Sequence, residues 1–221
     1  MNPVETVEQM NFIQRAFVEG GFVMYIIAVI GILSAILIVE RTMKLKSLSL
    51  DKREFTDQIF RMVVSGDIRQ AISFCDSRPA PLSNTVKAGL VQAINKRPDE
   101  EVQVAMDAAV MREMPKVEGW TSFLAVFGNV AVLAGLLGTI IGMIGSFKAV
   151  AEADPATKAM ELSKGISHAL NCTAFGLLVS ITCIVAYGLF QHRIQKAEND
   201  VVETSMSLLN LVVANRDKIR D

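Results

Sequence analysis

The stretch GWTSFLAVFGNVAVLAGLLGTIIGMIGSF, residues 119–147, contains no Asp, Glu, Lys or Arg over 29 residues. Two further stretches share this property: Gly20–Val39 with 20 residues and Gly165–His192 with 28. Roughly 20 apolar residues of helix cross a bilayer core about 30 Å thick, so each stretch is long enough to span a membrane. Buried helices of a soluble protein are the alternative, but three such runs would leave little polar surface to solvate the chain. The sequence therefore predicts an all-α integral membrane protein with three transmembrane helices.

The charges that flank these runs predict the orientation of the chain. A cleavable signal peptide would begin with a basic segment, whereas residues 1–19 carry three Glu and one Arg. Basic residues follow the first run instead, at Arg41, Lys44 and Lys46, and such residues favour the cytoplasmic side. The N-terminus is therefore expected on the outer side. The expected segments are an outer N-terminal segment 1–21, transmembrane helices 22–40, 119–147 and 165–192, a cytoplasmic helical domain 41–118, an outer loop 148–164, and a cytoplasmic C-terminal helix 193–221.

The cytoplasmic segment has the periodicity of helices rather than of strands. Its apolar residues recur at spacings of three and four, in four groups. The groups are Phe55, Ile59, Met62 and Val63; Ile68, Ala71, Ile72 and Cys75; Val86, Leu90, Val91 and Ile94; and Val102, Ala105, Met106 and Ala109. Asp67 and Asp99 are candidate N-caps, and Pro79-Ala80-Pro81 predicts a connector. No phosphate-binding loop or nucleophile arrangement is found, so no enzymatic activity is expected.

The C-terminal segment continues this helical pattern. Its apolar residues form one stripe of Val201, Val202, Met206, Leu209 and Val213. An apolar stripe on a helix is buried against another helix, so packing between copies of the chain is expected.

Cysteine spacing and net charge indicate which other kinds of site are not expected. Cys172 and Cys183 lie eleven residues apart, about 16 Å along one predicted helix, which is too far for a disulfide. With Cys75, they are interpreted as reduced packing residues. No spacing resembles a metal site, and no cofactor is expected. A net charge of −1 without a basic run gives no indication of nucleic-acid binding.

Small residues recur along the second run at spacings of 3, 4, 3, 4 and 3. They are Gly128, Ala131, Gly135, Gly138, Gly142 and Gly145. This spacing places them on one helical face, and small residues let membrane helices approach closely. We therefore predict that this face packs helices, with Gly176 contributing from the third run. The alternative is that these glycines only reflect the high glycine content of membrane helices.

Polar side chains lie on and beside these faces. Thr139, Ser146 and Asn129 belong to the second run, and Thr173 and Ser180 to the third. Polar groups in lipid usually face a bundle interior or a wet path, although a single hydroxyl can bond to a carbonyl of its own helix. Two such rows favour a wet path, and antiparallel packing would set Thr139 and Thr173 at similar depth.

Three motifs in the second run, Gly119-Trp120-Thr121, Gly128-Asn129-Val130-Ala131 and GLLGTIIGMIGSF at 135–147, resemble the second membrane helix of the MotA/TolQ/ExbB proton channel family. GISHALNCTAFGL at 165–177 resembles that family's pattern G-I-S-E-A-L-x-x-T-A-x-G-L. The Glu40-Arg41 pair that closes the first helix also fits. The resemblance covers the whole chain, and without a large cytoplasmic insertion it is closer to ExbB and TolQ than to MotA.

The resemblance implies a multi-pass subunit of the bacterial inner membrane, whose outer segments are periplasmic. Such subunits form a homo-oligomer, a pentamer, around a dimer of a single-span ExbD/TolR-like partner that supplies a transmembrane Asp. The assembly is a motor driven by the proton motive force, which energises TonB-dependent import or Tol-type envelope maintenance through a TonB- or TolA-like effector. By motif match, Thr139 and Thr173 face the partner's carboxylate, while Gly135, Gly138 and Gly142 pack the helices.

The three uncharged runs provide a separate argument about mechanism. A proton path through hydrocarbon normally needs a titratable relay, and these runs contain no Asp or Glu. Either the chain does not move protons, or a partner inserts the carboxylate. A non-conducting structural scaffold for a single-span partner is therefore the alternative function.

The sequence departs from the family pattern at three positions. Val132 and Thr182 replace prolines, which predicts straighter helices, and His168 stands where Glu is usual. Imidazole titrates near neutral pH, so His168 is a candidate proton relay at the outer end of the pore. The alternative is a boundary histidine that hydrogen-bonds a neighbour.

Overall fold

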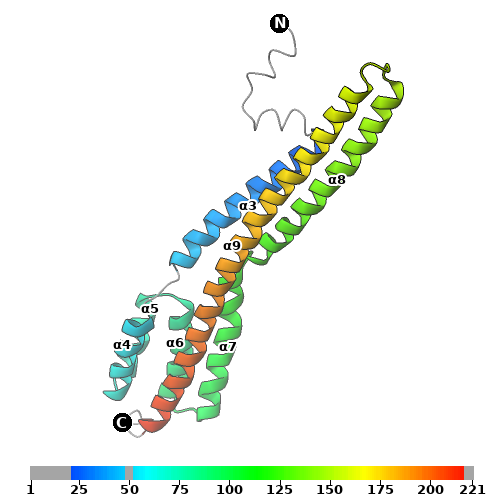
Figure 1. Ribbon diagram of the computed structural model, residues 1–221. Coiled ribbons are helices and arrows are strands. Elements are labelled where there is room, and N and C mark those ends of the chain that lie inside the picture. The colour runs from blue at the N-terminus through cyan, green and yellow to red at the C-terminus, as the bar shows by residue number, and fades with distance from the viewer. Residues whose placement is uncertain (1–20, 48–51, 217–221) are drawn as a thin grey trace. The chain divides into compact units, whose positions relative to one another are not determined.

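The computed structural model describes residues 21–47 and 52–216, without the side chains of Ser47 and His168. Within these ranges all regular structure is helical, as predicted (Figure 1). The helices are α3 (Gly21–Ser47), α4 (Lys52–Val64), α5 (Ile68–Ser77), α6 (Pro81–Ile94), α7 (Asp99–Glu118), α8 (Ser122–Glu152) and α9 (Lys158–Ala214). Three helical stretches are long and apolar enough to cross a membrane: Gly21–Lys46, Asp99–Glu152 and Lys158–Ala214. The N-terminal segment expected over residues 1–21 lies almost entirely outside the described residues.

The chain divides into two compact units, which we call the membrane unit and the charged unit. The membrane unit contains residues 21–39 and 120–188, and the charged unit contains residues 40–119 and 189–216 among those described.

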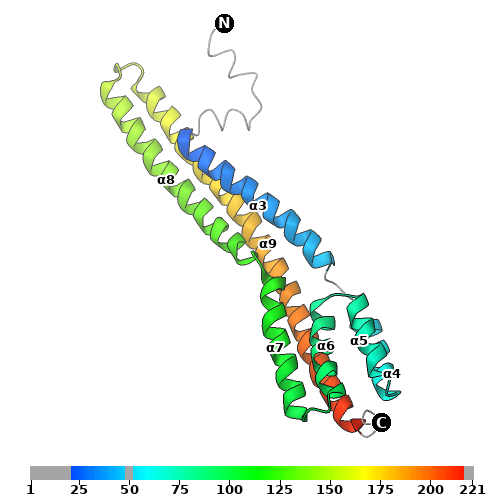
Figure 2. The ribbon, with the colours of Figure 1, turned by 180° about the vertical axis from the view of Figure 1, so that it is seen from behind.

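In the membrane unit, α8 and the first part of α9 run antiparallel, with α3 alongside (Figures 1 and 2). The segment 148–164 was expected as a loop, but α8 continues to Glu152 and α9 begins at Lys158, so only residues 153–157 are not helical. Both helices therefore extend beyond their uncharged runs. Neither helix is interrupted at Val132 or Thr182, where the family pattern has proline.

Large apolar side chains cover the outside of the membrane unit. Leu133 on α8 is 64% exposed and Leu178 on α9 is 65% exposed. Such exposure would be unfavourable in water, whereas lipid tails solvate these side chains. Within residues 21–39, the buried residues of α3 are apolar except for Ser34, whose hydroxyl donates a hydrogen bond to the Ile30 carbonyl at 2.7 Å.

The charged unit has a core of larger apolar side chains from α4, α5, α6, α7 and α9. Each of the four predicted apolar groups supplies part of this core. Of the predicted C-terminal stripe, Val201 is buried in the core and Leu209 packs against it, whereas Val202, Met206 and Val213 are exposed. The buried members are Phe55, Ile59, Val63, Ile68, Ala71, Cys75, Leu82, Val86, Leu90, Ala93, Val102, Met106, Val201, Leu208 and Val212. The rings of Phe55 and Phe74 stack with centroids 5.6 Å apart.

Neither predicted N-cap makes a cap hydrogen bond. Asp67 precedes α5 but its side chain makes none. Asp99 is the first residue of α7, and Pro98 occupies the N-cap position. The proline's fixed φ suits the start of a helix, and the Asp99 carboxylate instead lies 2.6 Å from Arg216 Nη1. This ion pair joins the start of α7 to the end of α9.

Gly119, at the end of α7, has φ +46, a conformation that favours glycine. A Cβ atom on Gly119 would lie only 2.2 Å from Nη1 of Arg41. Arg41 is 2% exposed, and its Nε lies 2.8 Å from Glu40 Oε2. Gly119 therefore allows the chain to turn and also leaves space for a buried guanidinium.

Candidate functional site

The contact between α8 and α9 in the membrane unit is made largely by small residues. A Cβ atom on Gly135 would lie 3.1 Å from the Cys172 carbonyl oxygen and 3.2 Å from Thr173 Cα. A Cβ atom on Gly176 would lie 2.6 Å from the Ala131 carbonyl oxygen. The neighbouring atoms belong to the backbone, which cannot move aside as a flexible side chain can. The two helices therefore approach as closely as glycine allows.

The same face also contacts α3. A Cβ atom on Gly138 would lie 2.7 Å from Cys172 Cβ and 3.2 Å from Val23 Cγ1 of α3. Gly128 approaches the opposite helix in the same way, because its Cβ atom would lie 3.3 Å from Cys183 Cβ. From Gly128 to Gly138, the small-residue face of α8 is thus a packing surface within one chain.

The part of this face nearest the C-terminal end of α8 behaves differently. A Cβ atom on Gly145 would have no atom within 4 Å, so Gly145 does not pack helices within the chain, contrary to expectation. Gly142 is half-buried, and its carbonyl accepts a hydrogen bond from Ser146 Oγ at 2.7 Å. The physical reason is that α9 contacts α8 here through Gly165 against Ser146, whereas Gly145, one residue away, only lines a groove beside this contact.

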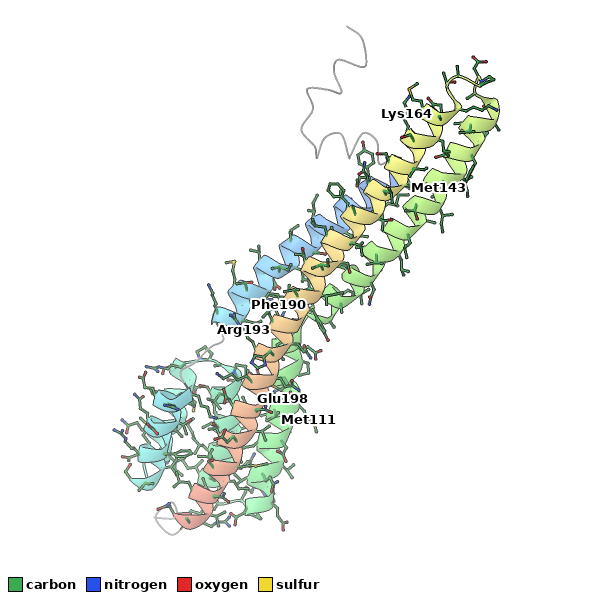
Figure 3. The ribbon with its side chains drawn as sticks, in the orientation of Figure 1. Met111, Met143, Lys164, Phe190, Arg193 and Glu198 are labelled. Carbon is green, nitrogen blue, oxygen red and sulfur yellow. The ribbon has the colours of Figure 1, made fainter. Side chains whose placement is uncertain are left out.

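This groove lies between the last turns of α8 and the first turns of α9, on the helices where Figure 3 labels Met143 and Lys164. Its volume is about 760 Å³. Its lining combines apolar side chains, small residues and polar groups: Ile141, Gly142, Gly145, Ser146, Ala149, Met160, Glu161, Ser163, Lys164, Gly165 and Ser167. Glu161 Oε1 lies 3.0 Å from Lys164 Nζ. The end of the membrane unit where α8 is followed by α9 therefore has an open groove with a polar rim.

Thr139 and Thr173 make different hydrogen bonds. Thr173 Oγ1 donates to the Gly135 carbonyl at 3.1 Å, across from α9 to α8. Thr139 Oγ1 donates to the Leu136 carbonyl on its own helix at 2.6 Å. Since Gly135 precedes Thr139 by four residues, the two threonines are staggered by about one turn, roughly 6 Å. Each hydroxyl oxygen can still accept a hydrogen bond.

The other polar candidates occupy three kinds of position. Ser146 and Ser180 are buried, at 5% and 3% exposed, and Ser146 Oγ lies where a Cβ atom on Gly165 would be. These two residues lie in helix contacts rather than on an open surface of the chain. Asn129 is exposed on α8. The side chain of His168 lies outside the described residues.

Sequence reasoning missed the small residues of α9 that match the α8 glycines. Besides Gly176 and Ser180, Gly165, Ala169, Cys172 and Cys183 continue this line. Their spacings are 4, 3, 4, 4 and 3, a signal comparable to that of the α8 glycines. The free cysteines Cys172 and Cys183 are both buried, in keeping with their interpretation as packing residues.

Ionisable groups cluster outside this site. Among the described residues, no group of three or more His, Cys, Asp or Glu side chains is arranged to hold a metal ion. In the charged unit, hydrogen bonds to Asp200 and Glu203 raise the pKa of Lys52. Glu113 is buried, which by itself raises the pKa of its carboxyl, but hydrogen bonds from Lys116 and Asn84 outweigh burial and lower that pKa.

Comparison with known proteins gives a consistent result. Residues 77–203 match the MotA/TolQ/ExbB proton channel family. The Tol-Pal system protein TolQ of Pseudomonas aeruginosa is 28% identical over 204 residues, covering 87% of both chains. A putative biopolymer transport protein ExbB homolog of Methanothermobacter thermautotrophicus is 32% identical over 199 residues, covering 88% of this chain and 68% of the homolog. The biopolymer transport protein ExbB of Pseudomonas putida is 26% identical over 174 residues, covering 75% of this chain and 52% of that protein.

Proposed function

Because the chain belongs to the MotA/TolQ/ExbB proton channel family, we propose that it is the pore-forming outer-ring subunit of an inner-membrane motor driven by the proton motive force. The family is one of channels, which agrees with the expectation that the chain is not an enzyme. Family membership also implies a partner of the ExbD/TolR type.

The proposed assembly is a homopentamer around a dimer of that single-span partner. The membrane runs of this chain have no Asp or Glu, so the proton-carrying carboxylate comes from the partner. Work done by the motor is passed to a TonB- or TolA-like effector. TolQ-type and ExbB-type relatives both support this class of function, and co-purification of the chain with its effector would distinguish a Tol-type from a TonB-type system.

The observation that carries the proposal is the pair of threonine hydrogen bonds beside the close helix contact. The protons of Thr139 and Thr173 are both donated to backbone carbonyls, of Leu136 and Gly135. What the threonines offer to an incoming group is therefore an acceptor oxygen. A protonated carboxyl can donate to such an oxygen at once, whereas an ionised carboxylate must first draw a hydroxyl away from its carbonyl.

This difference gives the two threonines a role in proton transfer. The neutral carboxyl is accommodated with the hydroxyls as they stand, which favours the protonated form inside the membrane. Once the proton leaves, rotation of a threonine hydroxyl supplies a hydrogen bond to the carboxylate. The cost of burying that charge falls, because a charged acceptor gains a stronger hydrogen bond than a neutral one.

Protons would reach this region through the groove at the outer end of the membrane unit. Ser163 and Ser167 line it, and the Glu161–Lys164 ion pair lies at its polar rim. We place His168, next to Ser167 in the chain, as a relay at this opening. Replacement of His168 by Gln should then alter the pH dependence of motor-linked activity, and an unchanged pH profile would remove His168 from the path.

The pore assignment is tested by substituting both threonines. The Thr139→Ala, Thr173→Ala double variant should assemble with the partner but lose energy coupling. The matched control is the Thr139→Ser, Thr173→Ser double variant, which keeps both hydroxyls and should retain coupling. Thr182→Ala is a second control, because this exposed hydroxyl bonds to Leu178 of its own helix at 2.9 Å. Full activity of the alanine double variant would contradict the assignment and favour a non-conducting scaffold.

A further inference from the structure

Two apolar stripes lie on the surface of the charged unit. The α7 stripe is Val104, Ala108, Met111 and Pro115, spaced by 4, 3 and 4 residues and exposed throughout. Met111 is 78% exposed, and Figure 3 labels it on the side of α7 away from the other helices of its unit. The α9 stripe is Val202, Met206, Leu209 and Val213, with the same spacing. Met206 is 63% exposed.

The α7 stripe points away from the rest of the charged unit, and so do Val202, Met206 and Val213 of the α9 stripe, while Leu209 is partly buried against the core. The α7 stripe lies on the opposite side of its helix from Val102, Met106 and Ala109, which are buried in the core. On α9, Asp200 faces α4, since its Oδ1 lies 2.8 Å from Lys52 Nζ. At about 100° per residue, the α9 stripe lies roughly 140° round the helix from Asp200. It therefore faces away from α4.

Lipid does not cover these stripes. The α7 stripe lies among exposed charged residues of the same helix: Glu100, Glu101, Asp107, Arg112 and Glu118. Placing so many charges in hydrocarbon would be expensive. An exposed apolar stripe in water marks a protein contact, so another polypeptide is the expected occupant.

The two stripes lie at the same height in the bundle. Arg216 Nη1 on α9 lies 2.6 Å from Asp99 Oδ1 on α7, which fixes the relative height of these antiparallel helices. Met111 lies 12 residues from Asp99, about 18 Å along α7, and Met206 lies 10 residues from Arg216, about 15 Å along α9. The two methionines therefore differ in height by only about 3 Å.

We propose that the α7 stripe of one copy packs against the α9 stripe of the next copy, head to tail around a ring. Copies inserted in one membrane share an orientation, and a closed ring relates them by rotation without a change of height. A ring contact therefore joins two different patches at equal height, which is what these stripes provide. A single-span partner or an effector would need only one stripe. This inference rests on the homo-oligomer of the proposed function.

Cysteine cross-linking of the full chain in membranes tests the proposal. The chain would have Met111→Cys and Met206→Cys together, on a background whose own cysteines are buried. Burial raises the pKa of the Cys75 thiol to about 12, so this thiol reacts slowly at neutral pH. Mild oxidation should give a ladder of cross-linked dimers, trimers and higher species. Each single variant should remain uncross-linked, because a head-to-tail contact never brings identical residues together.

The control pair is Arg69→Cys with Met206→Cys. Arg69 is exposed on α5, which carries neither stripe, so this pair should give no ladder. Native mass spectrometry of the unsubstituted chain would establish separately whether it forms an oligomer. An oligomer with a ladder only from the Met111/Met206 pair supports the proposal. An oligomer with no ladder, with a ladder from the control pair, or with dimers from a single variant overturns the stripe contact alone. A monomer overturns the proposed ring as well.

Discussion

The membrane unit and the charged unit are both helical bundles, but different kinds of side chain hold them together. In the charged unit, Phe55, Ile59 and Leu90 are fully buried and large. In the membrane unit, the α8–α9 contact is made by Gly128, Gly135, Gly138 and Gly176 against small side chains and backbone. Most large residues of α8 and α9 face outward there, and large buried side chains such as Met24 and Ile27 lie on α3.

This difference follows from the solvent of each unit. Water drives large apolar side chains into a core in proportion to the area they bury. Lipid tails are as apolar as leucine, so burial gains nothing there, and helices associate through close van der Waals contact and hydrogen bonds between helices. The Thr173–Gly135 hydrogen bond at 3.1 Å is one such bond. The comparison predicts that removing atoms damages the charged unit, whereas adding atoms damages the membrane unit.

The largest effect is expected from Phe55→Ala. Phe55 has no exposed surface, so its loss leaves a cavity that costs about 3–5 kcal/mol. Denaturant unfolding of the full chain, followed by hydrogen exchange in residues 52–118, would measure the loss of stability. Met111→Ala, at an exposed position, is the matched control and should change this stability in the unassembled chain by less than about 0.5 kcal/mol. Equal effects of the two substitutions would break the comparison.

The next largest effect is expected from adding one carbon at Gly176. Its Cβ atom would lie 2.6 Å from the Ala131 carbonyl oxygen, so Gly176→Ala should force α8 and α9 apart and cost about 1–3 kcal/mol. Gly188→Ala is the control, because a Cβ atom there has no atom within 4 Å. Thermal unfolding in detergent should show a lower midpoint for Gly176→Ala only. A similar fall for both variants would mean that flexibility rather than close packing explains these glycines.

A smaller effect is expected at Gly119, where backbone conformation and packing act together. A left-handed conformation costs a non-glycine residue about 1–2 kcal/mol, and the new Cβ atom would meet the Arg41 guanidinium. Because a long side chain can move, Gly119→Ala should lower the stability of the charged unit by little more than the backbone cost. The Gly119→Ala, Arg41→Ala double variant separates the backbone cost from the contact with the guanidinium. If the new Cβ atom displaces the Arg41 guanidinium, the effects of the two substitutions on stability will not add. Additive effects would mean that the two residues are not in contact.

The smallest effect concerns the pH dependence of the charged unit. The pKa of Glu113 is lowered because hydrogen bonds from Lys116 and Asn84 outweigh burial. A carboxyl whose pKa is lower in the folded state stabilises the fold above its unfolded pKa, and this contribution is lost as the pH falls through the folded value. Between pH 5 and pH 3, about the range over which such a contribution is lost, Glu113→Gln should therefore lose less stability than the unsubstituted chain. Parallel acid-unfolding curves for both chains would contradict this reading.

The sequence predicts the two units to different degrees. Uncharged runs and period-3.6 patterns were enough to locate three helical stretches able to span a membrane and most of the core of the charged unit. The C-terminal pattern instead selected Val202, Met206 and Val213, which are exposed, and missed the buried Leu208 and Val212. Asp67 occupies the N-cap position of α5 as predicted, without a side-chain cap hydrogen bond. The cap was wrong at Asp99, which pairs with Arg216, 117 residues away, and no local pattern reveals such a partner. Gly145 was expected to pack like Gly138, but α9 contacts α8 at the neighbouring Ser146, where a Cβ atom on Gly165 would meet Ser146 Oγ. Spacing alone does not predict which side of the helix is contacted.

The threonines show the same limit within the site. Motif resemblance selected Thr139 and Thr173, but it did not distinguish a hydroxyl bonded within its own helix from one bonded across to α8. That distinction depends on the distance between two backbones, which is set by Gly135 and Gly176 on opposite helices. The close contact and the hydrogen bond are therefore two consequences of the same small residues.

The central claim is that this chain supplies hydroxyls and a partner supplies the carboxylate. Proton flux into liposomes under an imposed pH gradient tests it most directly. Liposomes with this chain alone should be as impermeable to protons as empty liposomes. Liposomes with the chain and its ExbD/TolR-type partner should conduct protons. Replacing the partner's transmembrane Asp by Asn should reduce the proton flux to that of empty liposomes. Proton flux through the chain alone, or undiminished flux with the Asn partner, would contradict the account.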